Sequence, residues 1–308
     1  MNIMQKDWIH LRRDRDTGIE SVHAHFSGHA YDPHTHDELL VGVTLRGVQQ
    51  FNCRRSLHTS TQGSAMLIEP GVLHDGHAPS GYDFTYIMLS LPQAWVCGML
   101  QQRKRVDLGV LGATFQDTLV DSPELSAAII RAFEGLQGQE GRLARGQRLE
   151  RLIDLLSQCV TSDPVAVARE CTGALMRARD YLHDYIDTDI TLDELASVSG
   201  IDRFRLTRQF GRHFGLSPHA YLVRLRLRKA KKMLADGIRP VEVAARTGFS
   251  DQSHMGRWFK RAYRLTPLAY QQSCTNVLYR GSGMIDDANE EAKATHETLK
   301  VCSTPKLR

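Results

Sequence analysis

Short apolar runs separated by turn-forming residues dominate the first hundred positions of the chain. Turns are predicted at Arg46-Gly47, which would join two strands as in a hairpin, and at Pro70-Gly71. The predicted strands span residues 39–45, 48–53, 65–68 and 84–91. Many short strands with regular breaks indicate a small barrel or sandwich.

From residue 123 onward the apolar spacing becomes helical. Leucine, isoleucine and phenylalanine recur three and four positions apart, on either side of a glycine-bearing stretch at 138–146. The spacing predicts two amphipathic helices that form a hairpin. Such a hairpin could carry a dimer interface, or it could cover the barrel of its own chain, and the pattern alone does not separate these two arrangements.

The region from residue 174 to 273 is predicted to be helical throughout and contains an internal repeat. Its copies are residues 192–221 and residues 241–270, which align at an offset of 48 up to the central glycine and 49 beyond it. The second copy therefore has one extra residue just after its turn. Each copy reads as a helix, a tight turn and a second helix.

Capping signals define the helices of the first copy. Thr191 and Glu194 have the spacing of a capping box. Gly200 allows the left-handed backbone of a tight turn, and Asp202 can cap a second helix over 203–214.

The second copy has a related set of signals. Pro240 can occupy the first helical position, and Gly248 can make the turn. Ser250 is predicted to cap a helix over residues 251–263. A helix over 218–235 joins the copies, and its eighteen residues would span about 27 Å.

Charge separates the two parts of the chain. Residues 173–272 carry 18 Lys and Arg against 10 Asp and Glu, a net of +8, whereas residues 1–172 carry 16 against 20, a net of −4. A basic module suits a polyanion such as nucleic acid, although a solvated charged face has the same composition.

The rest of the sequence limits the expected cellular location and the expected chemistry. The sequence contains neither a long apolar span nor a signal-peptide core, and its six cysteines form no C-x-x-C pair. We therefore expect a cytoplasmic protein without a membrane partner. Phosphate-binding loops and nucleophile motifs are also missing.

The duplicated helical region resembles the DNA-binding domain of the AraC/XylS family of transcription regulators. The run from Gly248 to Tyr270 reproduces a family pattern, GF-x(9)-F-x(7)-P-x-x-Y. The resemblance implies two helix-turn-helix units, about 192–213 and 241–264, which present their second helices to successive major grooves. Carried over by position, the base-reading face falls on Phe204, Thr207, Arg208, Gln252, Ser253, His254 and Arg257. Arg203 and Lys260 join the candidate DNA-binding residues because of their charge.

These positions divide by chemistry. Arg208 and Arg257 are the strongest candidates for base contacts because arginine can bond a guanine edge through two hydrogen bonds. Arg203 and Lys260 suit phosphate contacts, which position a protein without reading sequence.

The N-terminal strands resemble a cupin barrel of the kind that carries the effector site in many members of this family. The residues that carry the resemblance, and form the candidate ligand site, are His34, His36, Glu38 and His74. In metal-binding cupins the glutamate follows the histidine pair by about four positions, but Glu38 follows His36 by only two. We therefore expect no metal and no other cofactor, and predict a small polar ligand; groups that merely brace the barrel are the alternative.

Together these features predict a multidomain α+β chain. Its parts are a cupin-like domain (1–122), a helical hairpin (123–160), a linker (161–173), a DNA-binding domain (174–273) and a disordered tail (274–308). The predicted function is ligand-controlled, sequence-specific regulation of transcription, not catalysis. Its partners would be promoter DNA, a small effector, RNA polymerase and a second copy of the chain. Two alternatives are a metal-dependent cupin enzyme and an architectural DNA-binding protein without ligand sensing.

Overall fold

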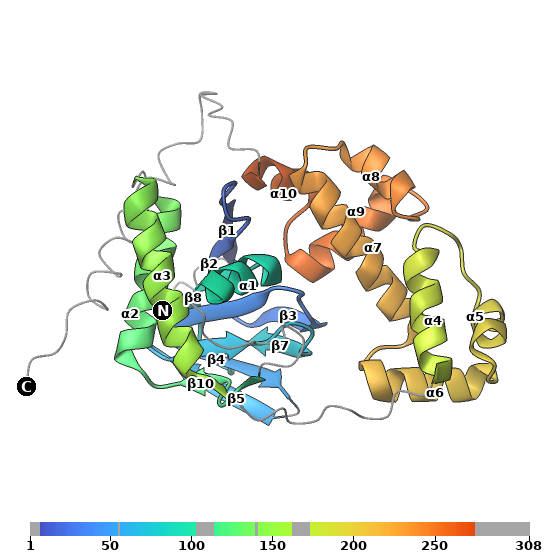
Figure 1. Cartoon of the computed structure of the whole chain (residues 1–308), viewed down its shortest axis with the longest axis horizontal. Coiled ribbons are helices and arrows are strands. Elements are labelled where there is room, and N and C mark those ends of the chain that lie inside the picture. Colours follow the sequence, from blue (N-terminus) through green and yellow to red (C-terminus); the bar gives the residue numbers. More distant parts are fainter. Residues whose placement is uncertain (1–6, 55, 103–113, 139–140, 162–172, 275–308) are drawn as a thin grey trace, which may run out of the picture. The chain divides into compact units, whose positions relative to one another are not determined.

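A computed structural model describes residues 7–54, 56–102, 114–138, 141–161 and 173–274 (Figure 1). The described chain divides into two compact units, with the boundary between Thr161 and Gly173. Most of the predicted linker and tail lie outside the described residues. Gly173 begins the first helix of the second unit, and Cys274 ends the last one, where its side chain is buried.

The described residues of the first unit form strands and three helices. The strands are β1 (Trp8–Arg13), β2 (Glu20–Phe26), β3 (His29–His34), β4 (Leu39–Cys53), β5 (Ser56–Thr61), β6 (Ala65–Ile68), β7 (His74–His77), β8 (Phe84–Leu91), β9 (Thr114–Phe115), β10 (Leu119–Val120) and β11 (Val160–Thr161). The helices are α1 (Gln93–Gln102), α2 (Pro123–Gln137) and α3 (Arg142–Gln158). The pairs that these strands form are all antiparallel. Helix α1 was not predicted from the sequence.

The longest strand, β4, corrects the prediction of a hairpin turn at Arg46-Gly47. Its first half pairs with β6 and β8, and its second half pairs with β5 and β7. An irregularity between Thr44 and Arg46 bends the strand, and Gly47 has a φ of +77°. A side chain at Gly47 would collide with the Asp83 carbonyl oxygen, so glycine here allows a close approach of two backbone segments.

Alternate residues of the strands face two apolar clusters. Val41, Val43 and Leu45 of β4 face a cluster that includes the buried stripes of α2 and α3, whereas Leu40 belongs to a second cluster on the other face of the strand. The helical hairpin thus covers the barrel of its own chain, which was one of the two predicted arrangements. Helix α3 begins before Gly146, which was expected to lie in the loop.

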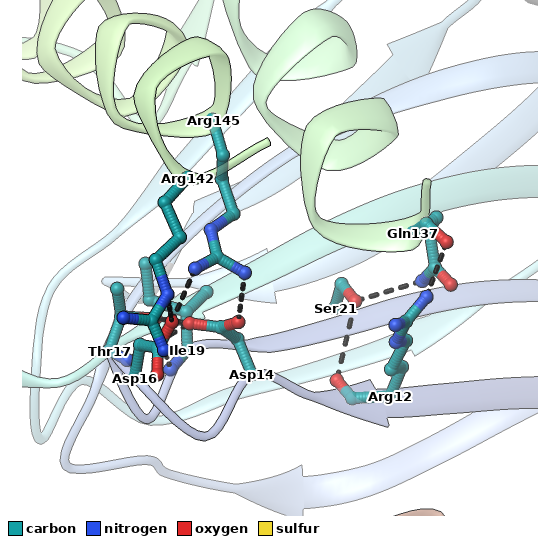
Figure 2. A network of polar contacts seen from close by, with 9 residues as sticks. All are labelled: Arg12, Asp14, Asp16, Thr17, Ile19, Ser21, Gln137, Arg142 and Arg145. Atoms are coloured by element: carbon teal, nitrogen blue, oxygen red, sulfur yellow. Dashed lines mark hydrogen bonds and ion pairs between the residues drawn. The ribbon is translucent and has the colours of Figure 1, made fainter. Parts of the chain in front are cut away.

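Polar contacts also attach the hairpin to the barrel (Figure 2). Arg145 of α3 forms ion pairs with Asp14, 2.8 Å away, and Asp16, 2.5 Å away, in the turn that joins β1 to β2. At the end of α2, the Gln137 side chain donates to Ser21 Oγ at 2.8 Å, and Arg12 donates to the Gln137 carbonyl oxygen. The hairpin and the first strands are therefore held together by polar and apolar contacts.

The second unit is all α-helical. Its helices are α4 (Gly173–Asp184), α5 (Leu192–Ser199), α6 (Arg203–Phe214), α7 (Pro218–Ala235), α8 (Pro240–Arg246), α9 (Gln252–Tyr263) and α10 (Pro267–Cys274). The Thr191–Glu194 capping box and the Asp202 cap are present, and Pro240 occupies the start of α8. The α9 cap is Asp251, not the predicted Ser250.

Helix α7 lies between the two helix pairs and joins them (Figure 1). A second connection lies at the turn between α8 and α9, where Gly248 has a φ of +74°. A side chain at Gly248 would come within 2.8–2.9 Å of the Asp187 backbone, in the loop between α4 and α5. The second helix pair therefore packs directly against the loop that leads into the first.

No described helix is both long and apolar enough to cross a lipid bilayer.

Candidate DNA-binding interface and effector site

Helix α6, the second helix of the first pair, has a buried face and an exposed basic face. Leu206 and Phe210 are fully buried in the core that α6 shares with α4, α5 and α7. The opposite face exposes Arg203, Arg205 and Arg208, and the helix contains no acidic residue. Arg203 forms an ion pair with Asp193 of α5 at 3.5 Å, and the exposed arginines together offer positive charge to a polyanion.

Two uncharged residues complete the α6 face. Phe204 is 75% exposed, with the Arg203 guanidinium 5.1 Å from the centre of its ring, so it lies outside the core. An exposed aromatic ring can contact a thymine methyl group. The Thr207 hydroxyl donates to the Arg203 carbonyl oxygen at 2.8 Å, which leaves its oxygen available as an acceptor.

Helix α9 is the corresponding element of the second pair. Met255 and Phe259 are fully buried, whereas Gln252, Ser253, Arg257 and Lys260 are exposed on the outer side. The first turn of α9 is more polar and less basic than that of α6. Amide and hydroxyl groups in this position suit hydrogen bonds to base edges or to phosphate oxygens.

His254 is engaged within its own helix pair. The Trp258 indole donates to His254 Nε2 at 3.0 Å, so the imidazole carries its proton on Nδ1, which donates to Ser250 Oγ at 3.0 Å. Both ring nitrogens are thus used in a chain from Trp258 to Ser250. The spacing of Ser250, His254 and Trp258, four residues apart, was the sequence signal for this network.

Asp251 fixes the start of the same helix. Its carboxylate accepts a hydrogen bond from the His254 backbone amide at 2.7 Å, and this bond lowers the pKa of the carboxyl group. The Ser250 hydroxyl, predicted to be the cap, instead donates to Asp251 at 3.4 Å.

The basic residues of α7 have two different roles. Arg226 donates to the carbonyl oxygens of Ile186 and Thr188 at 2.8 and 2.7 Å, and burial lowers its pKa, so it braces the α4–α5 loop. Arg228 and Lys232 are exposed. Part of the positive charge that was read as a nucleic-acid signal is therefore structural.

In the first unit, three of the four predicted ligand residues come together. His34 and His74 are direct partners in the β3–β7 register, and the Gly71 amide donates to the His36 carbonyl oxygen at 2.7 Å. Ligand atoms of the three histidines lie within 4.8 Å of one another. Their ring centres are 4.4 Å (His34–His74), 4.8 Å (His34–His36) and 5.4 Å (His36–His74) apart.

Backbone carbonyls fix the orientation of two of these rings. His34 Nδ1 donates to the Asp32 carbonyl oxygen at 2.8 Å, and His74 Nδ1 donates to the Val72 carbonyl oxygen at 3.0 Å. Because a carbonyl oxygen can only accept, Nδ1 carries the proton in each contact, and the neutral form of either ring has its lone pair on Nε2. Glu38, the fourth predicted residue, is not in the group of donor atoms that the described residues bring together here.

Comparison with known proteins identifies both units. Residues 16–156 match the model of the AraC-like ligand binding domain, and residues 195–273 match that of a helix-turn-helix domain. The chain is thus a DNA-binding transcription regulator with a separate ligand-binding domain. The two matches lie one after the other along the chain and support an AraC-family transcription regulator.

Two curated relatives match this chain over most of their own length. The uncharacterised HTH-type transcriptional regulator YbfI of Bacillus subtilis is 26% identical over 257 residues, 82% of this chain and 91% of YbfI. The HTH-type transcriptional activator RhaS of Salmonella arizonae is 25% identical over 254 residues, 79% of this chain and 88% of RhaS.

Solved structures support the same fold. Apo ToxT K231A of Vibrio cholerae has a TM-score of 0.54 at 12% identity, covering 86% of this chain and 100% of that chain. ToxT with a bound unsaturated fatty acid has a TM-score of 0.52 at 14% identity, covering 89% and 99%.

Proposed function

We propose that this chain activates transcription by placing α6 and α9 in successive major grooves of promoter DNA, under the control of a small molecule bound in the N-terminal barrel. The observation that carries the proposal is the pair of exposed recognition faces, neither of which contains an acidic residue, joined by α7. Its eighteen residues, about 27 Å long, suit the roughly 34 Å between grooves on one face of the duplex.

Within these faces we assign base contacts first to Arg208 and Arg257. Phe204, Thr207, Gln252 and Ser253 are further candidates for the base edges, and Arg203 and Lys260 for phosphates. We assign His254 a positioning role, because its two ring nitrogens already bond to Trp258 and Ser250. It would hold the start of α9 at the correct angle for its neighbours.

The effector is proposed to bind at His34, His36 and His74, and Glu38, two residues after His36 in the sequence, is a further candidate. The ligand-bound ToxT structures show that a neighbour of this fold holds a small organic molecule. Ligand binding would shift the population of states that differ in DNA affinity. The helix-turn-helix units give a binding function to the part of the chain that a cupin enzyme would leave unused, so we propose no catalytic activity.

Two protein partners complete the proposal. RNA polymerase is the expected partner of an activator at a promoter, and we propose a cytoplasmic location. A homodimer would use the outer face of the hairpin, where Leu143 of α3 is 79% exposed. Sedimentation of the wild type and of Leu143→Glu tests this: a dimer that the variant abolishes is expected, and a wild-type monomer at all concentrations would contradict it.

The central test is selection of bound duplexes from fragmented genomic DNA with the full-length protein, followed by titration of the recovered sites. We expect two recognised stretches about one helical turn apart, 10–10.5 base pairs. Duplexes with the same composition in shuffled order are the control. Recovery of fragments with no shared sequence, or equal affinity for shuffled duplexes, would show that the protein is architectural.

A further inference from the structure

We propose that His34, His36 and His74 bind one divalent transition-metal ion, of the kind that prefers imidazole ligands, such as Zn²⁺ or Co²⁺. The inference rests on the proposed effector site and deepens it. It also reverses the expectation of no metal, which depended on a four-ligand set including Glu38. Three histidines are sufficient as protein ligands of zinc when the fourth position is taken by water or a small ligand.

The first argument is convergence. The donor atoms of all three residues lie within 4.8 Å of one another, and they reach this point from different parts of the chain. His34 ends β3, His36 follows it in the connection to β4, and His74 begins β7. The β3–β7 register places His34 opposite His74, and the bond from Gly71 to His36 holds the connection in place.

The second argument is orientation. A histidine that binds a metal commonly donates its other ring N–H to a backbone carbonyl or carboxylate, which sets the tautomer and aims the lone pair. His34 and His74 have this arrangement through the carbonyl oxygens of Asp32 and Val72. With Nδ1 directed to a backbone carbonyl, Nε2 is the ring atom that each of these two histidines can offer to an ion. Small side-chain rotations would bring the nitrogens to the roughly 2.0–2.1 Å that zinc requires.

The third argument is selectivity. An all-imidazole set suits Zn²⁺, Co²⁺, Ni²⁺, Cu²⁺ or Fe²⁺ and is poor for Mg²⁺ and Ca²⁺, which prefer oxygen ligands. Three protein ligands leave a coordination position open. An effector with a carboxylate or hydroxyl oxygen could occupy that position, which would couple the ion to the control of DNA binding.

The test uses tag-free, chelator-treated full-length protein titrated with Co²⁺. One equivalent should produce a saturable visible absorption band that excess Zn²⁺ removes and excess Mg²⁺ does not. His34→Asn and His74→Asn should each weaken binding at least 10-fold. His77→Asn, on the same strand as His74 but outside the cluster, is the matched control and should bind like the wild type.

Folding and function are checked separately. Circular dichroism establishes that each variant is folded. Ring ¹H–¹⁵N spectra of the wild type should show three histidines shifting on addition of Zn²⁺, a readout that needs no variant. An absent Co²⁺ band, or a band that persists in the His34→Asn/His74→Asn double variant, would overturn the metal site. DNA titrations of the same samples show whether the proposed regulator function stands without it.

Discussion

The two helix pairs share one repeated sequence pattern but present different recognition faces. In the first pair, α6 exposes several arginines and Phe204, and Gly200 forms the turn between α5 and α6. In the second pair, α9 presents Gln252 and Ser253, and a network through His254 fixes the start of the helix. We infer that the first pair supplies more of the salt-dependent attraction, and the second more of the hydrogen-bonded discrimination.

The two turn glycines give the largest expected contrast. Both have a φ of +74°, so alanine at either position is strained by roughly 1–2 kcal/mol. At Gly200 the new Cβ would lie 3.5 Å from an arginine nitrogen, an ordinary contact, whereas at Gly248 it would collide with the Asp187 backbone. Overpacking adds about 1–3 kcal/mol. Denaturant unfolding should therefore show Gly248→Ala to be clearly less stable than Gly200→Ala, and equal losses would refute the close contact.

The arginines on the two faces should be separable by base pair. Arg208→Ala and Arg257→Ala should each lose about 1–3 kcal/mol of specific binding and relax preference at one position of the site. The affected positions should lie in different recognised stretches. Titration of singly substituted duplexes measures this, with Arg179→Ala on α4 as a control of equal charge change. If both variants relaxed the same position, the two-groove arrangement would be wrong.

The N-caps of the two helix pairs also differ, and the expected change in the free energy of unfolding is smaller. The first pair has a capping box at Thr191 and Glu194, whereas Arg239, the corresponding position before α8, makes no side-chain cap. Thr191→Ala should lower the free energy of unfolding by about 1 kcal/mol. Arg239→Thr creates the same spacing with Glu242 and should raise it by about 0.5–1 kcal/mol. A shift of the same sign in both variants would contradict this account.

The smallest effect is expected at Lys260, on the flank of α9. Lys260→Ala should weaken all duplexes alike, by about 1 kcal/mol or less, and lower the salt slope by about 1. Binding measured at several salt concentrations tests this. If Lys260→Ala instead lost preference at one base pair, Lys260 would have to be assigned to a base edge and not to a phosphate.

Local signals predicted the helical unit well and the barrel less well. Gly200, Asp202 and Pro240 act through their own backbone positions, so the sequence shows their roles directly. Gly47 has an ordinary turn signature, but it lies inside β4, where it allows a close approach of the Asp83 backbone that only the folded barrel creates. Helix α1 has neither a clear apolar stripe nor charged residues in its end turns, and it was missed.

The candidate sites divide in the same way. Exposure of Phe204, Arg208 and Arg257 follows from helical periodicity once the buried face is known. The histidines converge through the pairing of distant strands, which no local pattern encodes; the resemblance to cupins supplied that expectation. The hydrogen bonds that occupy His254 required coordinates, although its spacing to Ser250 and Trp258 was visible.

The contact between Gly248 and the Asp187 backbone has a consequence for promoter architecture. Because α7 and this contact both join the helix pairs, the protein itself fixes the distance and rotation between α6 and α9, and the DNA does not. One base pair inserted between the recognised stretches turns the far stretch by about a tenth of a helical turn. Operators of this regulator should therefore vary in sequence far more readily than in spacing.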